Sequence, residues 1–212
     1  MSKIAGVILA GGLARRMGGG DKGLRAIGDL RLIDHVIARL RPQVDALALN
    51  ANGDPARFSA LGLPVLADSL PDYPGPLAGV LAGLDWAAAQ GFDAIVTAAA
   101  DTPFFPNDLT AQLRVAAGPS GLALAASQDP ATGQVYRQPT FGLWPVVLRG
   151  DLRAALMGGL RKIVLWTDQH QAGQAVFSAA PFDPFFNVNT PEDLALAEQM
   201  VQGMDKVGMA KP

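Results

Sequence analysis

The chain has 212 residues, a formal net charge of −2, and a composition of 50% hydrophobic and 17% charged residues. These values are typical of one globular domain and exclude a disordered chain, and the small net charge argues against general nucleic-acid binding. The sequence contains no cysteine, which excludes disulfides, thiolate catalysis and cysteine-ligated zinc or iron–sulfur clusters.

The first apolar run, residues 4–10, predicts a buried strand. It is at the lower length limit for a signal peptide, and two arginines follow it, so a strand is the better interpretation. No stretch approaches the roughly 20 apolar residues that a membrane helix needs. We therefore expect a cytoplasmic protein that contacts neither membranes nor nucleic acids.

A glycine-rich loop follows this strand, from Leu9 to Lys22. It contains five glycines, and its cations are Arg15, Arg16 and Lys22. Glycine lets backbone N–H groups surround an anion without hindrance from a Cβ atom, and nearby cations neutralise that anion. In α/β proteins, a loop of this kind binds phosphate at the carboxyl edge of the sheet. The loop therefore predicts a phosphate site.

Two common phosphate-loop motifs do not fit this loop. Gly18, Gly20 and Gly23 have the spacing of a dinucleotide fingerprint, but the strand ends too early and residues 24–28 look extended rather than helical. Asp21-Lys22-Gly23 lacks both the preceding glycine and the following hydroxyl of a P-loop. We therefore set aside a dinucleotide-dependent dehydrogenase and a P-loop enzyme.

Strand and helix patterns alternate along the first half of the chain. The predicted helices are residues 32–40, 76–90 and 106–117. The predicted strands are residues 44–49, 63–67 and 93–100, and the last of these is a mostly apolar run, as in a strand buried on both faces. The alternation predicts an α/β fold, a single-domain three-layer sandwich with a mostly parallel, Rossmann-like sheet.

The second half of the chain is less regular. Its predicted strands are residues 121–127, 140–144 and 162–166, with a polar loop at 128–138 and a helix at 151–157. Thr190 precedes Pro191 and two acidic residues, as the N-cap of a last helix would. We expect one domain over residues 1–203, followed by a frayed tail at 204–212.

Four residues fall just past predicted strand ends: Gly11, Asn50, Asp68 and Asp101. Open α/β sheets bind ligands at this edge, so we expect these residues to form one nucleotide site. Asp101 could cap a turn, but beside phosphates it favours a Mg²⁺ site, because Mg²⁺ takes one or two carboxylates together with phosphates and water. Taken alone, Asn50 would more often be a turn residue.

Several blocks of sequence, spread from about residue 6 to residue 197, together resemble the molybdenum cofactor guanylyltransferase family of nucleotidyltransferases. The blocks are Leu9-Ala10-Gly11-Gly12, Asp21-Lys22-Gly23-Leu24, Leu49-Asn50-Ala51-Asn52, Asp68-Ser69-Leu70, Tyr73-Pro74-Gly75-Pro76-Leu77-Ala78-Gly79, Asp101-Thr102-Pro103 and Asn187-Val188-Asn189-Thr190-Pro191. That family joins GMP from GTP to molybdopterin and releases pyrophosphate. The resemblance implies the same reaction, with Mg²⁺ as cofactor and GTP and molybdenum-molybdopterin as substrates. It also implies transient contact with proteins that supply molybdopterin and accept the finished cofactor.

The resemblance further implies roles for individual residues. The implied GTP-binding residues are Leu9, Ala10, Gly11, Gly12, Lys22, Asn50, Asp68, Gly75 and Asp101. The implied catalytic residues are Lys22, Arg16 and Asp101, with Asp101 as the metal ligand. The implied molybdopterin-binding residues are Gly19, Asp21, Lys162, Asn187 and Asn189. Residues 1–118 would form the GTP-binding half of the domain and residues 119–203 the molybdopterin-binding half.

The reaction implied by the resemblance needs no general base. The terminal phosphate of molybdopterin would attack, and its second pKa of about 6 leaves it mostly ionised at neutral pH. This fits a sequence whose two histidines, His35 and His170, belong to no recognisable constellation. Where the family often has a histidine before Pro-Thr, this chain has Gln138, whose role the resemblance does not define.

Alternative functions remain at this stage. A molybdopterin cytidylyltransferase or a sugar-phosphate nucleotidyltransferase would use the same chemistry, but these relatives typically have Leu-Ala-Ala-Gly where this chain has Leu9-Ala10-Gly11-Gly12. A non-catalytic nucleotide-binding regulatory module is the alternative from another class. The presence of both Lys22 and Asp101 argues against such a module.

Overall fold

The apolar run near the N-terminus forms β1 (Ile4–Leu9), which lies inside a seven-stranded sheet of order β5-β4-β1-β6-β8-β7-β9. The computed structural model describes residues 2–11, 20–70 and 75–207, with side chains as far as residue 203. The other strands of the sheet are β4 (Ala46–Asn50), β5 (Val65–Leu66), β6 (Ala94–Ala99), β7 (Ala123–Gln128), β8 (Val135–Pro145) and β9 (Gly173–Ser178).

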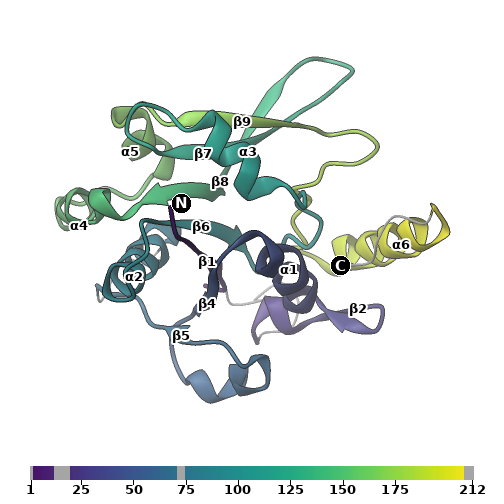
Figure 1. Cartoon of the computed structure of the whole chain (residues 1–212). Coiled ribbons are helices and arrows are strands. Elements are labelled where there is room, and N and C mark those ends of the chain that lie inside the picture. Colours follow the sequence, from purple (N-terminus) through teal and green to yellow (C-terminus); the bar gives the residue numbers. More distant parts are fainter. Residues whose placement is uncertain (1, 12–19, 71–74, 208–212) are drawn as a thin grey trace.

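Helices cover both faces of this sheet (Figure 1). On one face, α1 (Leu32–Leu40) and α3 (Leu109–Ala116) enclose a first hydrophobic core. On the other face, α2 (Pro76–Ala89), α4 (Arg149–Met157) and α5 (Ile163–Gln169) enclose a second core. The predicted three-layer α/β class with a mostly parallel sheet is therefore confirmed.

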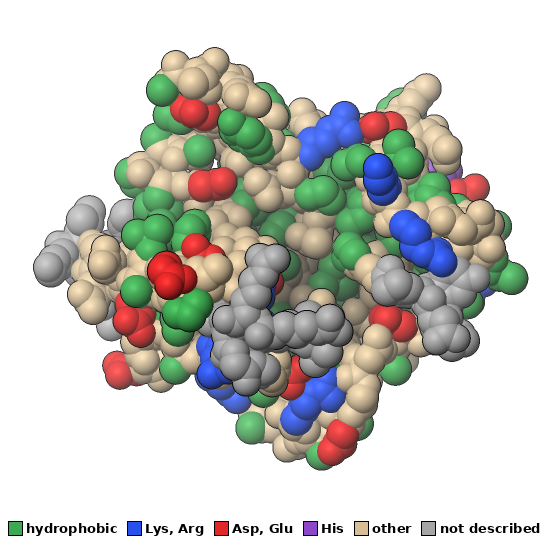
Figure 2. Space-filling model, turned by 180° about the vertical axis from the view of Figure 1, so that it is seen from behind, with side chains coloured by type: hydrophobic (Ala, Val, Ile, Leu, Met, Phe, Trp, Pro, Cys, Tyr) green, Lys and Arg blue, Asp and Glu red, His purple; other side chains and the backbone are tan. Residues whose placement is uncertain are grey.

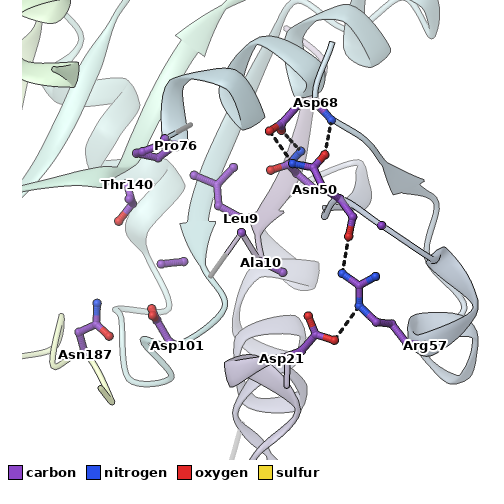
Figure 3. Close-up of a pocket in the computed structure, with 15 residues that line it drawn as sticks. Leu9, Ala10, Asp21, Asn50, Arg57, Asp68, Pro76, Asp101, Thr140 and Asn187 are labelled. Carbon is purple, nitrogen blue, oxygen red and sulfur yellow. Dashed lines mark hydrogen bonds and ion pairs between the residues drawn. The ribbon is translucent and has the colours of Figure 1, made fainter. Parts of the chain in front are cut away.

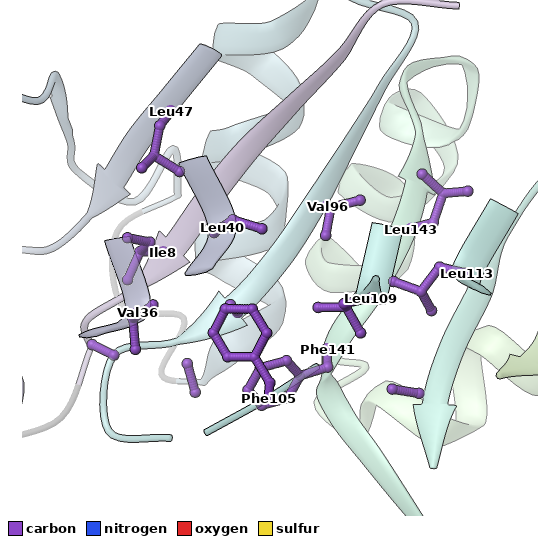
Figure 4. Close-up of a cluster of buried hydrophobic side chains, with 14 of the residues drawn as sticks. Ile8, Val36, Leu40, Leu47, Val96, Phe105, Leu109, Leu113, Phe141 and Leu143 are labelled. Carbon is purple, nitrogen blue, oxygen red and sulfur yellow. The ribbon is translucent and has the colours of Figure 1, made fainter. Parts of the chain in front are cut away.

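The central strands β1 and β6 are mostly apolar, as expected where helices cover both faces of the sheet. Ile8 of β1 and Val96 of β6 point into the first core, while the adjacent Val7 and Ile95 point into the second. Successive side chains of one strand thus pack alternately into two separate cores. Figure 4 shows the first core, where Phe105 and Phe141 lie with ring centroids 5.5 Å apart.

The strand order brings several carboxyl ends to one edge of the sheet. β1 is parallel to β4 on one side and to β6 on the other, and Leu9 is in register with both Asn50 and Ala99. β5 continues the parallel half beyond β4. The order of the sheet reverses at β1, and such a reversal is where open α/β sheets bind their ligands.

The second half of the chain corrects three of the predictions. Residues 162–166 were predicted as a strand, but Ile163 begins helix α5, because Ile163, Trp166 and Thr167 are buried at helical spacing. Strand β9 was not predicted at all. The predicted polar loop at residues 128–138 is shorter, since β8 already begins at Val135 and forms a hairpin with β7.

The C-terminal helix α6 (Pro191–Val207) confirms the predicted N-cap. The Thr190 hydroxyl accepts a hydrogen bond from Asp193 N at 3.1 Å, and Thr190 N donates to the Asp193 carboxylate at 2.9 Å, which is a reciprocal capping box. The helix continues to Val207, so the predicted tail from residue 204 begins too early.

A third, smaller core joins α6 to the N-terminal half. The hairpin of β2 (Ala26–Ile27) and β3 (Leu30–Arg31) packs there with Phe104 and with α6, which Figure 1 shows beside β2. Short 3₁₀ turns complete the fold: η2 (Lys22–Leu24), η3 (Arg41–Gln43), η4 (Pro55–Leu61) and η5 (Val146–Leu148). Among the described helices, none has the length and apolar character needed to cross a membrane.

Candidate active site

A cavity of about 720 Å³ opens at the carboxyl edge of β1, β4 and β6. This volume lies in the range of small-molecule sites. Predicted site residues make up most of its lining: Leu9, Ala10, Gly11, Asp21, Asn50, Asp68, Gly75, Asp101 and Asn187. The remaining lining residues are Asn52, Gly53, Arg57, Pro76, Ala99 and Thr140. One edge of the sheet thus brings together Gly11, Asn50, Asp68 and Asp101, which the sequence analysis placed at separate strand ends.

A carboxylate held by two amides lies at one end of the cavity (Figure 3). Asn50 Nδ2 donates to Asp68 Oδ1 at 2.9 Å, and Asn52 Nδ2 donates to Asp68 Oδ2 at 2.7 Å. Asp68 N donates to Asn52 Oδ1 at 2.9 Å, so Asn52 forms hydrogen bonds with both the side chain and the backbone of Asp68. Each carboxylate oxygen keeps further lone pairs for a ligand.

Asn50 is itself almost enclosed, with 5% of its surface exposed. Its Nδ2 also donates to the carbonyl of Leu66 at 3.1 Å, so both amide hydrogens have acceptors. Its Oδ1 lies against Gly79 of α2, so close that a Cβ at that glycine would approach it to 2.1 Å. The geometry therefore favours Asn50 as a support for Asp68 over a group that reads a ligand directly.

Arg57 forms a further wall of the cavity, from the 3₁₀ turn η4. Its Nε donates to Asp21 Oδ2 at 2.6 Å, and its Nη2 donates to the carbonyl of Asn52 at 2.5 Å. The guanidinium carbon also lies 4.6 Å from the centre of the Phe58 ring, a cation–π arrangement. Arg57 thereby ties Asp21, at the end of the glycine-rich loop, to the segment that holds Asp68.

A lysine with three oxygen acceptors lies at the opposite end of the site. Lys22 Nζ donates to Asp101 Oδ2 at 2.6 Å, to Asn187 Oδ1 at 3.3 Å and also to Asn189 Oδ1. These groups come from distant parts of the chain: after β1, after β6 and before α6. The backbone adds to this junction, since Val188 N donates to the carbonyl of Asp101 at 2.9 Å.

The three oxygens that surround Lys22 Nζ are also candidate ligands for a metal ion. They converge on one cation, the ammonium of Lys22, and carboxylate and amide oxygens are the ligands that hard cations prefer. Within the described ranges, however, no three His, Asp or Glu side chains come together as a metal site. The donor set therefore fits a cation that takes its other ligands from water or phosphate, as Mg²⁺ does.

Some predicted residues lie elsewhere. Lys162, predicted for molybdopterin, is exposed at the N-cap of α5 and does not line this cavity. Gly12, Arg16 and Gly19 lie outside the described residues. Lys22 and Asn189 reach the site through their contacts with Asp101 and with each other rather than as cavity walls.

Comparison with known proteins identifies the family of the chain. The profile of the family described as "MobA-like NTP transferase domain" matches residues 6–172. The chain belongs to this family of nucleotide transferases. It is thus an enzyme of the nucleotidyltransferase class, and its glycine-rich loop, Asp68 and Asp101 all lie within the matched residues.

Members of the family with curated names resemble the chain over nearly its whole length. A protein of Bradyrhizobium sp. (strain ORS 278) named "Molybdenum cofactor guanylyltransferase" is 50% identical over 208 residues, which cover 96% of this chain and 95% of that protein. A protein of Nitrobacter hamburgensis with the same name is 50% identical over 200 residues, covering 92% and 93%.

A solved structure shows the same fold. It is described as molybdopterin-guanine dinucleotide biosynthesis protein A from Archaeoglobus fulgidus and superimposes with a TM-score of 0.68 at 24% identity. The match covers 95% of this chain and 100% of that one. At this identity the likeness supports the fold alone.

Proposed function

We propose that the chain transfers GMP from GTP to molybdenum-molybdopterin, forming the molybdopterin guanine dinucleotide cofactor and pyrophosphate. One observation carries the proposal: a single cavity has an amide-held carboxylate, Asp68, at one end and a second carboxylate, Asp101, ion-paired with Lys22, at the other. The names of relatives at 50% identity support the choice of substrates. Transient contact with proteins that supply the pterin and accept the product belongs to the same proposal.

Asp68 would select the base. A carboxylate can accept hydrogen bonds from both N1–H and the exocyclic amino group of guanine, and adenine presents no such pair of donors. Because Asn50 and Asn52 fix the Asp68 carboxylate, it needs little reorganisation when the base arrives. A site built to accept hydrogen bonds from the correct base discriminates strongly against a base that lacks those donors.

The opposite end of the cavity would carry the chemistry. A pterin phosphate oxygen forms a bond to the α-phosphorus of GTP, the bond from that phosphorus to the bridging oxygen breaks, and pyrophosphate leaves with the electron pair. Lys22 and the backbone N–H groups of the loop would orient the phosphates and offset the repulsion between two anions. Asp101, with Asn187 and Asn189 nearby, would hold Mg²⁺, which supplies charge neutralisation at the phosphates. Arg16, Gly12 and Gly19 keep their proposed phosphate and pterin roles, as does Lys162 through its charge.

The central experiment measures pyrophosphate release with GTP, CTP and ATP in turn, with and without molybdopterin. We expect release that depends on the pterin, with kcat/KM for GTP at least about a hundredfold above the values for CTP and ATP. Preference for CTP would make the chain a cytidylyltransferase. Release that requires a sugar phosphate instead of the pterin would point to the other transferase class, and nucleotide binding without any release would point to a regulatory module.

The metal assignment has its own variant. Asp101→Asn keeps the size of the side chain but removes its charge, and we expect kcat to fall by about two to three orders of magnitude, as when an electrostatic group of a phosphoryl-transfer site is lost. The expected fall is the same at saturating Mg²⁺. Asp108→Asn serves as the control. Asp108 is an exposed carboxylate seven positions further along the same segment, so its loss should leave kcat unchanged. Normal turnover of the Asp101 variant would contradict the assignment.

A further inference from the structure

A second cavity of about 440 Å³ lies at the same edge of the sheet but shares no lining residue with the first. It is enclosed by the last turn of α1, by the segment after β6 and by the segment after β9. The residues that line it are Arg39, Phe104, Pro106, Asn107, Phe177, Ser178, Ala180, Pro181, Phe182 and Pro184. None of these lining residues is acidic, and Arg39 is the one cation among them.

Arg39 is an unusual side chain for such a place, because only 8% of its surface is exposed. Its Nη1 donates to the carbonyl of Phe105 and to Asn107 Oδ1, both at 3.1 Å. Its Nε is buried and has no hydrogen-bond partner among the described residues. Burial lowers the pKa of this guanidinium, and no carboxylate among the described residues opposes that shift. A buried cation without an anionic partner is costly, so binding of an anion beside it is favourable.

A purely structural role accounts for only part of this arrangement. Arg39 does fasten the end of α1 to the segment after β6, but it uses one of its three nitrogens to do so. Gln43 already makes the same connection, since its Nε2 donates to the carbonyls of Arg39 and Pro106. The Nη2 group takes no part in either connection and can pair with an anion in the cavity, whereas Nε is enclosed by the protein.

The other walls of the cavity are apolar. Phe104 and Phe182 meet edge to face with ring centroids 5.9 Å apart, and Phe177 and three prolines complete the wall. Ser178 and Asn107 are the polar residues among the described lining besides Arg39. A pocket that is mostly apolar and contains one fixed charge is typical of sites for small organic ions.

We propose that this cavity is a second ligand site, which binds a small organic anion by pairing its carboxylate or phosphate with Arg39 and packing its apolar part on Phe104, Phe177 and Phe182. The shared chemistry is an anionic head on an aryl or alkyl body. The site is independent of the proposed transfer reaction, because none of its residues lines the first cavity.

The experiment titrates the full isotope-labelled chain with phenyl phosphate, benzoate and inorganic phosphate in turn. The readout is the nuclear magnetic resonance signal of the Arg39 Nε–H group, identified by its loss in Arg39→Gln. We expect phenyl phosphate or benzoate, or both, to shift this signal saturably, and the better of the two marks which head group the site prefers. Inorganic phosphate should bind at least about tenfold more weakly, since it cannot use the apolar wall.

Two variants keep the test decisive. Ser178→Phe leaves Arg39 in place but fills the cavity, and it should weaken binding of the organic anion by about tenfold or more. Arg41→Gln removes an exposed cation just beyond α1 and should leave binding unchanged. The proposal is overturned by an Arg39 signal that never saturates, by inorganic phosphate binding as tightly as phenyl phosphate, or by shifts confined to residues of the first cavity.

Discussion

At the scale of single residues, the candidate site depends on groups that orient other groups. Asp68 would meet the ligand, but Asn52 determines where the carboxylate points, because it bonds both to the carboxylate and to the backbone of Asp68. Such a residue contributes through geometry rather than through a contact with the ligand. Its loss should therefore alter base selection more than the rate of the chemical step.

Asn52→Ala tests this role. We expect KM for GTP to rise about tenfold, discrimination against ATP to fall by a similar factor, and kcat to change little, since the variant loses binding that is uniform along the reaction. Steady-state kinetics with both nucleotides provide the measurement. Gln112→Ala is the matched control, because Gln112 is also an amide that donates to a carboxylate, Asp108, but it lies on the surface of α3. A kcat defect without a change in selectivity would argue against the orienting role.

The sequence predicted the strand-end residues of the site better than their supports. Asn50, Asp68 and Asp101 each end an apolar strand, and that position alone places them at the ligand-binding edge. Asn52 lies in the irregular segment after β4, and Arg57 lies in the 3₁₀ turn η4. No periodic pattern marks such positions, and only the three-dimensional path of the chain brings them to the cavity.

At the scale of elements, helix α2 depends on two glycines for its close approach to the sheet. A Cβ at Gly79 would lie 2.1 Å from Asn50 Oδ1, and a Cβ at Gly83 would lie 2.8 Å from Val7 Cγ2. Both glycines are buried within the helix, where alanine would otherwise be favoured by about 1 kcal/mol. The first glycine thus packs against the site, and the second packs only against the core.

This pair of glycines gives a prediction with its own control. Gly79→Ala forces the Asn50 amide to move, so we expect weaker GTP binding, by about tenfold, together with some loss of stability. Gly83→Ala presses on Val7 and Ile95 instead, so it should lower the free energy of unfolding by about 1–3 kcal/mol and leave the affinity of the folded enzyme for GTP unchanged. Calorimetric titration with GTP and urea unfolding separate the two effects. Equal GTP affinities for both variants would contradict the contact between α2 and the site.

Elements with a strong period were predicted, and short elements at the edge of the sheet were not. Helix α2 and strand β6 carry long apolar patterns and were found within a residue or two. Helix α5 has only seven residues, and its apolar start has the composition of a strand. Its helical spacing is visible only from the burial of Trp166 and Thr167 in the structure. Edge strand β9 has three apolar residues in a row, Ala175, Val176 and Phe177, with Val176 exposed, so its six positions show no clear alternation that would separate it from a loop.

At the scale of the whole molecule, the two halves of the chain share one sheet and one site. β8 pairs with β6, and Trp144 of β8 donates from Nε1 to Thr97 Oγ1 of β6 at 2.8 Å within the second core. At the sheet edge, Asn187 and Asn189 of the second half bond to Lys22 of the first. The division into a GTP-binding and a pterin-binding half stays a prediction, but neither part has a hydrophobic core of its own.

The stability of this single unit should depend on pH through a buried histidine. His35 of α1 is 4% exposed, and this burial lowers its pKa below the ordinary value of 6.5. The charge of Arg39 lowers the pKa further. A hydrogen bond to the backbone of Ile27 and the charge of Asp34 raise it, but by less than burial lowers it. Its Nε2 has no partner among the described residues. The folded chain therefore keeps His35 neutral in a range of pH where the unfolded chain takes up a proton.

The sign of the effect follows from this difference. Well above pH 6.5 His35 is neutral in both states and its contribution to stability is complete. As the pH falls through 6.5 the unfolded state gains protons, and stability declines until the folded pKa is reached. For one proton the slope is at most about 1.4 kcal/mol per pH unit. Urea unfolding of the natural chain should therefore show a decline as the pH falls below about 6.5 that His35→Gln lacks. His170→Gln, which removes the other histidine, should retain that decline. A slope that is the same in the natural chain and in His35→Gln would show that another group controls the acid stability.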